Sequence, residues 1–228
     1  MESCADLLWS VVITFFGERI FAKKFMRVVI IANELQWEEW PARINDVDWI
    51  RVSGTNEFIS HDADIYVDLE GESLHETFKQ INKPILIHCV TDTLASLNAP
   101  EDATRINAWP GFLQRSTWEI AGNFSAVVQA LAEISGKKII RVADEPGLVA
   151  PRVIAMIINE AYFAIGDGVS TKPEIDTAMK LGTNYPYGPF EWGEKIGIQN
   201  IYELLCKLNL TDKCYKPAPA LEAEVKYQ

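Results

Sequence analysis

The segment Asp176–Glu191 reads D-T-A-M-K-L-G-T-N-Y-P-Y-G-P-F-E and decides how the second half of the chain folds. Ala178 and Met179 fall on one face of a predicted helix, and Gly182 is placed to end that helix. The stretch Pro186–Pro189 (P-Y-G-P) then predicts a rigid turn into the next helix. The segment therefore indicates two consecutive helices with a fixed connection between them.

Further helices are predicted on both sides of this segment. Upstream, the apolar run Leu148–Ile165 predicts a long buried helix, with Pro151 in its first turn, where proline is tolerated. Thr171 is placed as the N-cap of the helix that follows. Downstream, Ile198–Leu208 predicts the last helix, and the tail after Asp212 is expected to be loose.

Before Asp144 the pattern changes to short apolar strands that alternate with helices. The first strand lies in M-R-V-V-I-I-A-N (Met26–Asn33), which is apolar and β-branched as buried parallel strands are. Alternation of this kind predicts a parallel sheet covered by helices on both faces. Strands are predicted at 27–32, 48–53, 64–69, 84–90, 104–108 and 138–143, and helices at 34–44, 73–80 and 124–134.

The chain therefore divides into four parts. We interpret residues 1–25 as an N-terminal extension outside the fold, arising from an upstream start codon. Its apolar run Leu7–Phe16 is too short to span a bilayer, and an amphipathic helix on a membrane surface is the alternative. Residues 26–144 form a sheet domain, residues 145–210 form a helical domain, and residues 211–228 form a tail.

Composition excludes some classes of partner. The chain has 228 residues and a net charge of −11, so it lacks the basic face that nonspecific nucleic-acid binding requires. No segment is long and apolar enough to predict a membrane span. Cys4, Cys89, Cys206 and Cys214 show no CxxC spacing, which predicts reduced, buried thiols in a cytoplasmic protein and no metal site.

Three stretches of the sequence resemble the C-terminal domain of the 3-hydroxyacyl-CoA dehydrogenase family. Asp176–Glu191 follows that family's pattern D-x-A-M-x-x-G-x-x-x-P-M-G-P-F-E, with Tyr187 in place of the methionine. Asp144–Arg152 (D-E-P-G-L-V-A-P-R) resembles D-x-P-G-F-V-x-N-R, and Ile196–Ile198 fits I-G-L. In the sheet domain the resemblance rests mainly on strand order.

The resemblance implies an α/β fold, with a shortened Rossmann-like parallel-sheet domain before an all-helical C-terminal domain that pairs with a second subunit. It also implies NAD as the cofactor. A dinucleotide site needs a glycine-rich turn after the first strand. Here Ala32–Leu35 (A-N-E-L) stands there, and Ser53–Thr55 stands where an acidic residue would hold the ribose. The NAD-binding half is therefore interpreted as degenerate.

The family's chemistry uses a histidine base that a glutamate orients, and Glu119 resembles that glutamate. Counting back from Glu119 by the family's spacing gives Asn107, and counting forward from Arg105 gives Pro110; neither is a histidine. A base with a near-neutral pKa is therefore missing. Glu119 is then either a catalytic residue or an ordinary polar one, and Thr91 is placed to keep a hydroxyl that the family presents to its substrate.

A second polar group follows a predicted strand at His88–Asp92 (H-C-V-T-D). Open α/β sheets gather ligands at the carboxyl ends of their strands. His88 and Thr91 therefore predict either a new polar site, belonging to a different enzyme class, or a partly buried histidine satisfied by backbone, which is the interpretation preferred. The spacing of His61, His75 and His88 does not predict a metal site.

Two functional hypotheses follow. The first is a 3-hydroxyacyl-CoA dehydrogenase-like protein of fatty acid metabolism whose NAD-dependent activity is impaired or absent. It would act as a dimeric acyl-CoA-type binding or regulatory module, a homodimer through its C-terminal helices. The second is an active oxidoreductase on a 3-hydroxyacyl-CoA-type substrate with an atypical cofactor site. Two independent losses, the glycine turn and the histidine, favour the first.

Overall fold

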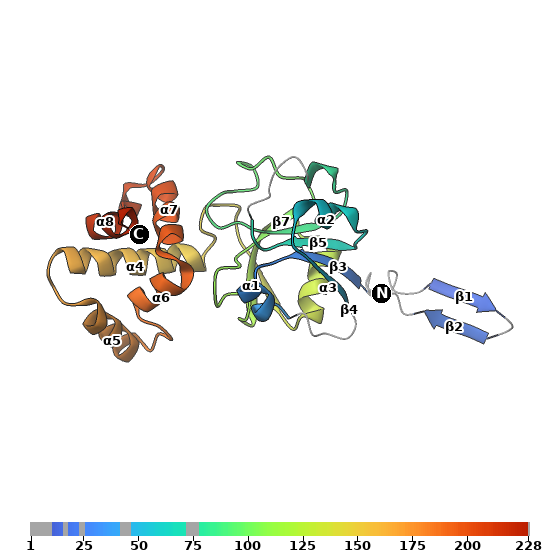
Figure 1. Ribbon diagram of the computed structural model, residues 1–228, viewed down its shortest axis with the longest axis horizontal. Helices are drawn as coiled ribbons and strands as arrows, with labels where there is room; N and C mark the ends of the chain where they lie inside the picture. The colour runs from blue at the N-terminus through green and yellow to red at the C-terminus, as the bar shows by residue number, and fades with distance from the viewer. Residues whose placement is uncertain (1–10, 16–17, 23–25, 42–46, 72–77, 228) are drawn as a thin grey trace.

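The computed structural model describes residues 11–15, 18–22, 26–41, 47–71 and 78–227 (Figure 1). A seven-stranded sheet in the order β4-β3-β5-β6-β7-β8-β9 forms one unit, and helices α4 to α8 form a second one beside it. The strands are β3 Met26–Ile31, β4 Val47–Val52, β5 Ile65–Asp68, β6 Ile85–His88, β7 Ala103–Ile106, β8 Thr117–Gly122 and β9 Lys138–Arg141. The helices are α1 Glu34–Glu39, α2 Thr55–Ser60, η2 Phe78–Gln80, α3 Ala126–Ile134, α4 Ala150–Gly166, α5 Lys172–Thr183, α6 Pro189–Ile196, α7 Ile198–Asn209, η3 Lys213–Tyr215 and α8 Pro219–Lys226.

The sheet is mostly parallel, and the predicted fold class is confirmed. Strands β3 to β7 pair in parallel, but β8 pairs antiparallel with β7 and then in parallel with β9. The sequence prediction missed β8 and the short helix α2. The signal for β8 was present, because Trp118 and Ile120 alternate with the more exposed Thr117 and Glu119.

Strand β3 shows why both faces of the sheet are covered. Val28 and Ile30 point into a core that includes residues of α3, whereas Val29 and Ile31 point into a second core beneath α2 and η2. Side chains alternate between faces along a strand, so an unbroken apolar run needs apolar partners on both sides. The helical cover predicted from the sequence is confirmed. The predicted helix at 73–80 lies mostly outside the described residues, apart from η2.

Two strands near the N-terminus form a separate antiparallel pair, β1 (Val11–Phe15) with β2 (Glu18–Ala22). Figure 1 shows this hairpin apart from the larger sheet. The alternative of an amphipathic helix is therefore wrong for residues 11–15. Their sequence V-V-I-T-F is β-branched, and such residues favour strands over helices. Residues 1–10 and 23–25 lie outside the described part of the chain.

The tail after Asp212 is not loose, contrary to the sequence prediction. It forms η3 and α8, and Ala218 and Leu221 are fully buried against the helical core. Asn159 of α4 holds the start of α8: its Nδ2 donates to the Lys216 carbonyl at 3.0 Å, and its Oδ1 accepts from Ala218 N at 2.8 Å. The prolines that suggested a loose tail instead prepare a helix start.

The segment 176–191 forms α5, a turn and α6, as predicted. Asp176 is buried, and its carboxylate accepts from the backbone N–H groups of Phe190 at 2.8 Å and Glu191 at 3.3 Å. A Cβ on Gly188 would lie only 2.2 Å from this carboxylate, so only glycine fits there. One expectation is wrong: α5 continues past Gly182 to Thr183, and its C-cap is Asn184, whose φ of 56° is the left-handed conformation that asparagine tolerates.

Arg105 of β7 connects the two units. Its side chain has no exposed surface and pairs with Asp144, at the boundary predicted near residues 144–147. Its Nε donates to the Cys89 carbonyl at 3.0 Å and its Nη2 to the Val90 carbonyl at 3.2 Å. Asp144 also accepts from Leu94 N at 2.9 Å. One buried cation therefore joins β7, the loop after β6 and the segment that leads into α4.

None of the helices in the described part of the chain has the length and apolar character needed to span a bilayer. The described cysteines are free but not buried, contrary to expectation, since Cys89 and Cys206 are partly exposed and Cys214 is exposed.

We expect Asp144→Ala to lower the free energy of unfolding by about 3 kcal/mol, because it leaves a buried guanidinium without its counter-charge. Urea denaturation followed by circular dichroism measures this change. Asp48→Ala is the matched control: it breaks the exposed Arg27–Asp48 pair, so it should have a much smaller effect. Equal effects of the two substitutions would contradict the structural role of Arg105.

Candidate functional site at the domain junction

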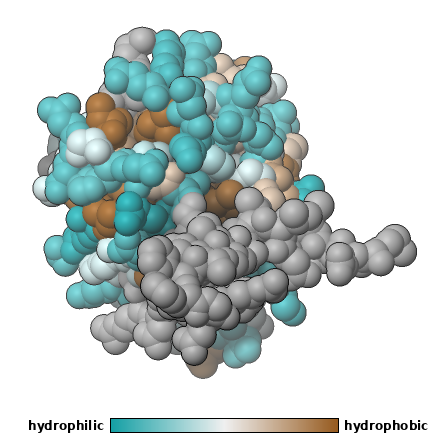
Figure 2. Space-filling view, turned by 90° about the vertical axis from the view of Figure 1, so that its right-hand side faces the viewer, coloured by the Kyte–Doolittle hydropathy of each residue, from teal (hydrophilic) through white to brown (hydrophobic). Residues whose placement is uncertain are grey.

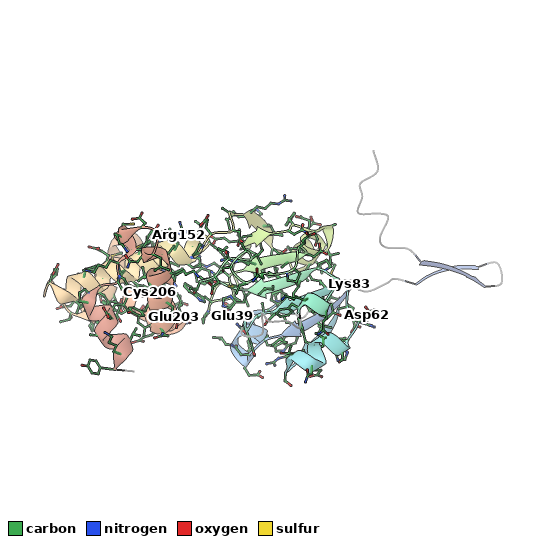
Figure 3. The ribbon with its side chains drawn as sticks, turned by 90° about the horizontal axis from the view of Figure 1, so that it is seen from above. Glu39, Asp62, Lys83, Arg152, Glu203 and Cys206 are labelled. Carbon is green, nitrogen blue, oxygen red and sulfur yellow. The ribbon has the colours of Figure 1, made fainter. Side chains whose placement is uncertain are left out.

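The carboxyl ends of the parallel strands face the helical domain. Figure 3 shows Glu39, the last residue of α1, on the side nearest α7, whereas Asp62 and Lys83, which precede β5 and β6, lie at the opposite end. Val90, after β6, and Trp109, after β7, belong to the hydrophobic core of the helical domain. The edge where open α/β sheets gather ligands is therefore also the junction between the domains.

The turn after β3 is closed by its own side chains. Asn33 Oδ1 accepts from Gln36 N at 2.9 Å, and Gln36 Oε1 accepts from Asn33 N at 3.1 Å. Gln36 Nε2 donates to the Leu69 carbonyl just after β5. This reciprocal capping box satisfies N–H groups at the start of α1, a helix of six residues. The spacing N-x-x-Q would have predicted it from the sequence.

A basic side chain stands near the end of β4. Arg51 Nη2 donates to the Ala32 carbonyl at 2.9 Å and pairs with Glu34 at 2.8 Å. Its guanidinium lies 5.3 Å from the centre of the Trp37 ring. Hydrogen bonding and attraction from Arg51 hold the pKa of the exposed Glu34 carboxyl below its usual value. These contacts tie the end of β4 to the turn after β3.

Asn107 follows β7 directly and occupies the position reached by counting back from Glu119. Its side chain is 4% exposed. Oδ1 accepts from Trp109 N at 3.0 Å, and Nδ2 has no hydrogen-bond partner among the described residues. Asn107 shares a cleft with Glu119, and Pro110 is not among the residues that line this cleft.

Glu119 projects from β8 onto the start of α4. Its carboxylate accepts from Val149 N at 3.1 Å and from Ala150 N at 3.0 Å. Gly147 and Leu148 precede these groups with φ of 86° and 47°, so the backbone turns sharply before the helix begins. Glu119 therefore caps α4, and a carboxylate is favoured there by the helix dipole. A catalytic role for Glu119 stays a prediction.

The cleft shared by Asn107 and Glu119 has a volume of about 370 Å³. It lies between the loop after β7, strands β8 and β9, and the start of α4. Its remaining lining residues are Phe112, Arg115, Ser116, Thr117, Trp118, Ile140 and Ala150.

His88 lies apart from this cleft. Its Nδ1 accepts from Ala108 N at 3.0 Å, which agrees with the interpretation of a histidine satisfied by backbone. Burial lowers the pKa of His88 to about 4, so the ring is neutral at physiological pH. A Cβ on Gly71 would lie 2.3 Å from the His88 carbonyl oxygen, so the loop after β5, which contains Gly71, packs closely against His88.

Thr91 lines a different cavity, of about 330 Å³, between the loop after β6 and α7. Asp92 beside it pairs with Lys207. Tyr202, Glu203 and Cys206 of α7 line the same cavity, and Figure 3 shows Glu203 and Cys206 on the side of α7 near the sheet domain. Glu119, Thr91 and His88 are therefore not brought together, and their catalytic roles stay predictions. Of the histidines considered for a metal, His75 lies outside the described residues.

These features define a Rossmann-like sheet domain joined to a helical C-terminal domain of the dehydrogenase type. The sequence profile described as "3-hydroxyacyl-CoA dehydrogenase, C-terminal domain" matches residues 147–228. The chain is 33% identical over 165 residues to the 3-hydroxyadipyl-CoA dehydrogenase of Escherichia coli K12, a match that covers 69% of this chain and 30% of that protein. It is 41% identical over 101 residues to a probable 3-hydroxybutyryl-CoA dehydrogenase of Bacillus subtilis, covering 43% of this chain and 35% of that protein.

Among solved structures, the (S)-3-hydroxybutyryl-CoA dehydrogenase PaaH1 of Ralstonia eutropha shares the fold, with a TM-score of 0.71 at 18% identity over 90% of this chain and 94% of that one. The helical half of the chain therefore carries the C-terminal domain of the 3-hydroxyacyl-CoA dehydrogenase family, and the match to the Escherichia coli protein extends the similarity beyond that domain. The chain's matches span only about a third of the first two relatives' lengths.

We expect Glu119→Ala to destabilise the protein by about 1 kcal/mol, the usual effect of removing a helix cap. Glu119→Gln should cost less, because its amide oxygen still accepts from the α4 backbone. Urea denaturation measures both, with Glu133→Ala on the exposed face of α3 as a control. If Glu119→Ala leaves stability unchanged, the capping role is wrong.

The lowered pKa of the partly buried His88 predicts a pH dependence of stability. Its folded pKa of about 4 lies below the ordinary value of 6.5, so between these values the unfolded chain binds more protons than the folded one. The free energy of unfolding should therefore fall as the pH decreases from 6.5 towards 4. In His88→Asn, whose Oδ1 can still accept from Ala108 N, denaturation at pH 7 and pH 5 should show a smaller loss than in the unmodified protein. An NMR titration that places the His88 pKa near 6.5 would contradict the assignment.

Proposed function

We propose that this chain is a 3-hydroxyacyl-CoA dehydrogenase-like protein that binds acyl-CoA-type ligands without ordinary NAD-dependent hydride transfer. The closed turn after β3 carries the proposal. A pyrophosphate needs free N–H groups at a helix start and glycines that let the backbone approach it. Here Asn33 and Gln36 cap the helix and Glu34 adds negative charge. We infer that these residues do not fit a dinucleotide.

The second support is the side chain at position 107. A carboxamide has no titratable proton near neutral pH, so Asn107 cannot take the proton of a substrate hydroxyl. The polar groups of the cleft can bind and orient a ligand. Asn107, at the position of the missing base, can therefore hydrogen-bond to a ligand but cannot take a proton from it.

The proposal includes a homodimer through the C-terminal helices, a regulatory or binding role in fatty acid metabolism, and a cytoplasmic location. Large apolar side chains are exposed on the helical domain, with Val153 at 53%, Leu181 at 83% and Leu210 at 75%. The opposite, sheet-domain end is mostly hydrophilic where Figure 2 colours it, with small separate hydrophobic areas. This contrast favours the helical side as the interface.

An active oxidoreductase with an atypical cofactor site is the second candidate. The observation that favours it is the cleft itself, which keeps Glu119 beside the position of the missing histidine. The relatives with 33% and 41% identity are both named as dehydrogenases.

Calorimetric titration of the intact protein with NADH, NADPH and hexanoyl-CoA separates the two candidates. We expect saturable binding of the acyl-CoA and none of either dinucleotide. We also expect Asn107→His to gain no dehydrogenase activity, because the cofactor turn stays closed. Saturable NADH binding would reject the leading proposal and support the oxidoreductase.

A further inference from the structure

The cleft between β7, β8 and α4 offers hydrogen-bond donors without partners. Asn107 Nδ2 is buried and has no hydrogen-bond partner in the part of the chain that the structure describes, whereas Oδ1 of the same carboxamide accepts from Trp109 N. A buried donor without a partner is unfavourable unless a ligand supplies an acceptor. Asn107 thus indicates a ligand oxygen that accepts a hydrogen bond.

The positively charged side chain of Arg115 lines the same cleft. Arg115 is exposed, forms no ion pair with any described residue, and has its guanidinium 4.2 Å from the centre of the Phe112 ring. Contact with this ring leaves the guanidinium N–H groups able to meet an anion at the mouth of the cleft.

The loop that carries Arg115 is held from both sides. Glu39 of α1 accepts from Gly111 N at 2.7 Å, and Gly111 has a φ of 85°. Lys137 Nζ donates to the Leu113 carbonyl at 2.8 Å and to the Arg115 carbonyl at 2.9 Å. The backbone at position 115 is therefore fixed before any ligand arrives.

The carboxylate of Glu119, which also lines the cleft, already accepts hydrogen bonds from the protein. Both oxygens of Glu119 accept from the backbone of α4, at Val149 N and Ala150 N. The helix start also offsets part of its charge. Asn107 Nδ2 and the Arg115 guanidinium are hydrogen-bond donors without partners among the described residues. They match a ligand group that only accepts hydrogen bonds, and an anion best of all.

We propose that this cleft binds the terminal carboxylate of a dicarboxylic acyl group, with Asn107 Nδ2 and the Arg115 guanidinium as its donors. The proposal rests on the acyl-CoA-binding function above and names the class of acyl group. A carboxylate fits because it accepts several hydrogen bonds at once and carries the charge that Arg115 attracts. A methyl terminus would leave Asn107 without a partner.

The test compares two six-carbon thioesters, adipyl-CoA and hexanoyl-CoA, by calorimetry on the intact protein at pH 8. We expect adipyl-CoA to bind about tenfold more tightly, the scale of one hydrogen bond to a charged group. Arg115→Gln and Asn107→Asp should abolish this preference; the second keeps an acceptor for Trp109 N and replaces the donor with a repelling oxygen. Equal binding of the two thioesters, or a preference that survives both substitutions, would overturn the proposal.

Arg141→Gln is the matched control, because Arg141 also lies over a phenylalanine ring, 3.6 Å from the centre of Phe124, but does not line the cleft. It should keep the preference for adipyl-CoA. Free adipate separates this proposal from the acyl-CoA function. If neither thioester binds, the acyl-CoA function fails; adipate binding that Arg115→Gln removes would still support the carboxylate site, and no adipate binding would reject it.

Discussion

The buried guanidinium of Arg105 is the constraint on which the junction between the domains depends. A charge with no exposed surface must be paired and hydrogen-bonded, and Arg105 meets this need with Asp144 and the carbonyls after β6. Those partners come from segments far apart in the sequence. The end of β6, the end of β7 and the entry to α4 are therefore held in one arrangement.

Two carboxylates also connect separate elements, because each helix start presents N–H groups that need acceptors. Glu119 supplies them for α4 from β8, and Asp176 supplies them for α6 from α5. Gly188 leaves room for Asp176 to do so. The motif D-x-A-M through G-P-F-E is therefore explained by architecture. These motifs therefore have a structural reason to be kept that does not depend on the chemistry of the site.

The fold could be read from the sequence because its signals are local. The β-branched run of β3 and the turn at Pro186–Pro189 each predict their own structure. The prediction for the tail after Asp212 was wrong because the structure of the tail depends on distant partners. The tail after Asp212 carries loop-like residues, and Asn159, far away on α4, holds the start of its helix. The sequence offered Glu119, Thr91 and His88 as candidate catalytic residues, and the structure places Glu119 and Thr91 at two different cavities, with His88 lining neither. Arg115 was not predicted as a site residue, because nothing in the local sequence distinguishes an arginine that lines a cleft from any other exposed arginine.

The turn after β3 and the cleft at Asn107 differ in the number of hydrogen bonds that a ligand would have to break. To admit a pyrophosphate, the turn after β3 would have to break the two reciprocal bonds between Asn33 and Gln36 and the bond from buried Gln36 to the Leu69 carbonyl. Each such bond contributes on the order of 1 kcal/mol, and an unsatisfied buried group costs more. At Asn107 no described bond must break, because the donor is already unpaired. A ligand oxygen thus gains a hydrogen bond at β7, whereas at β3 it would first have to displace three, so binding is expected on the Asn107 side.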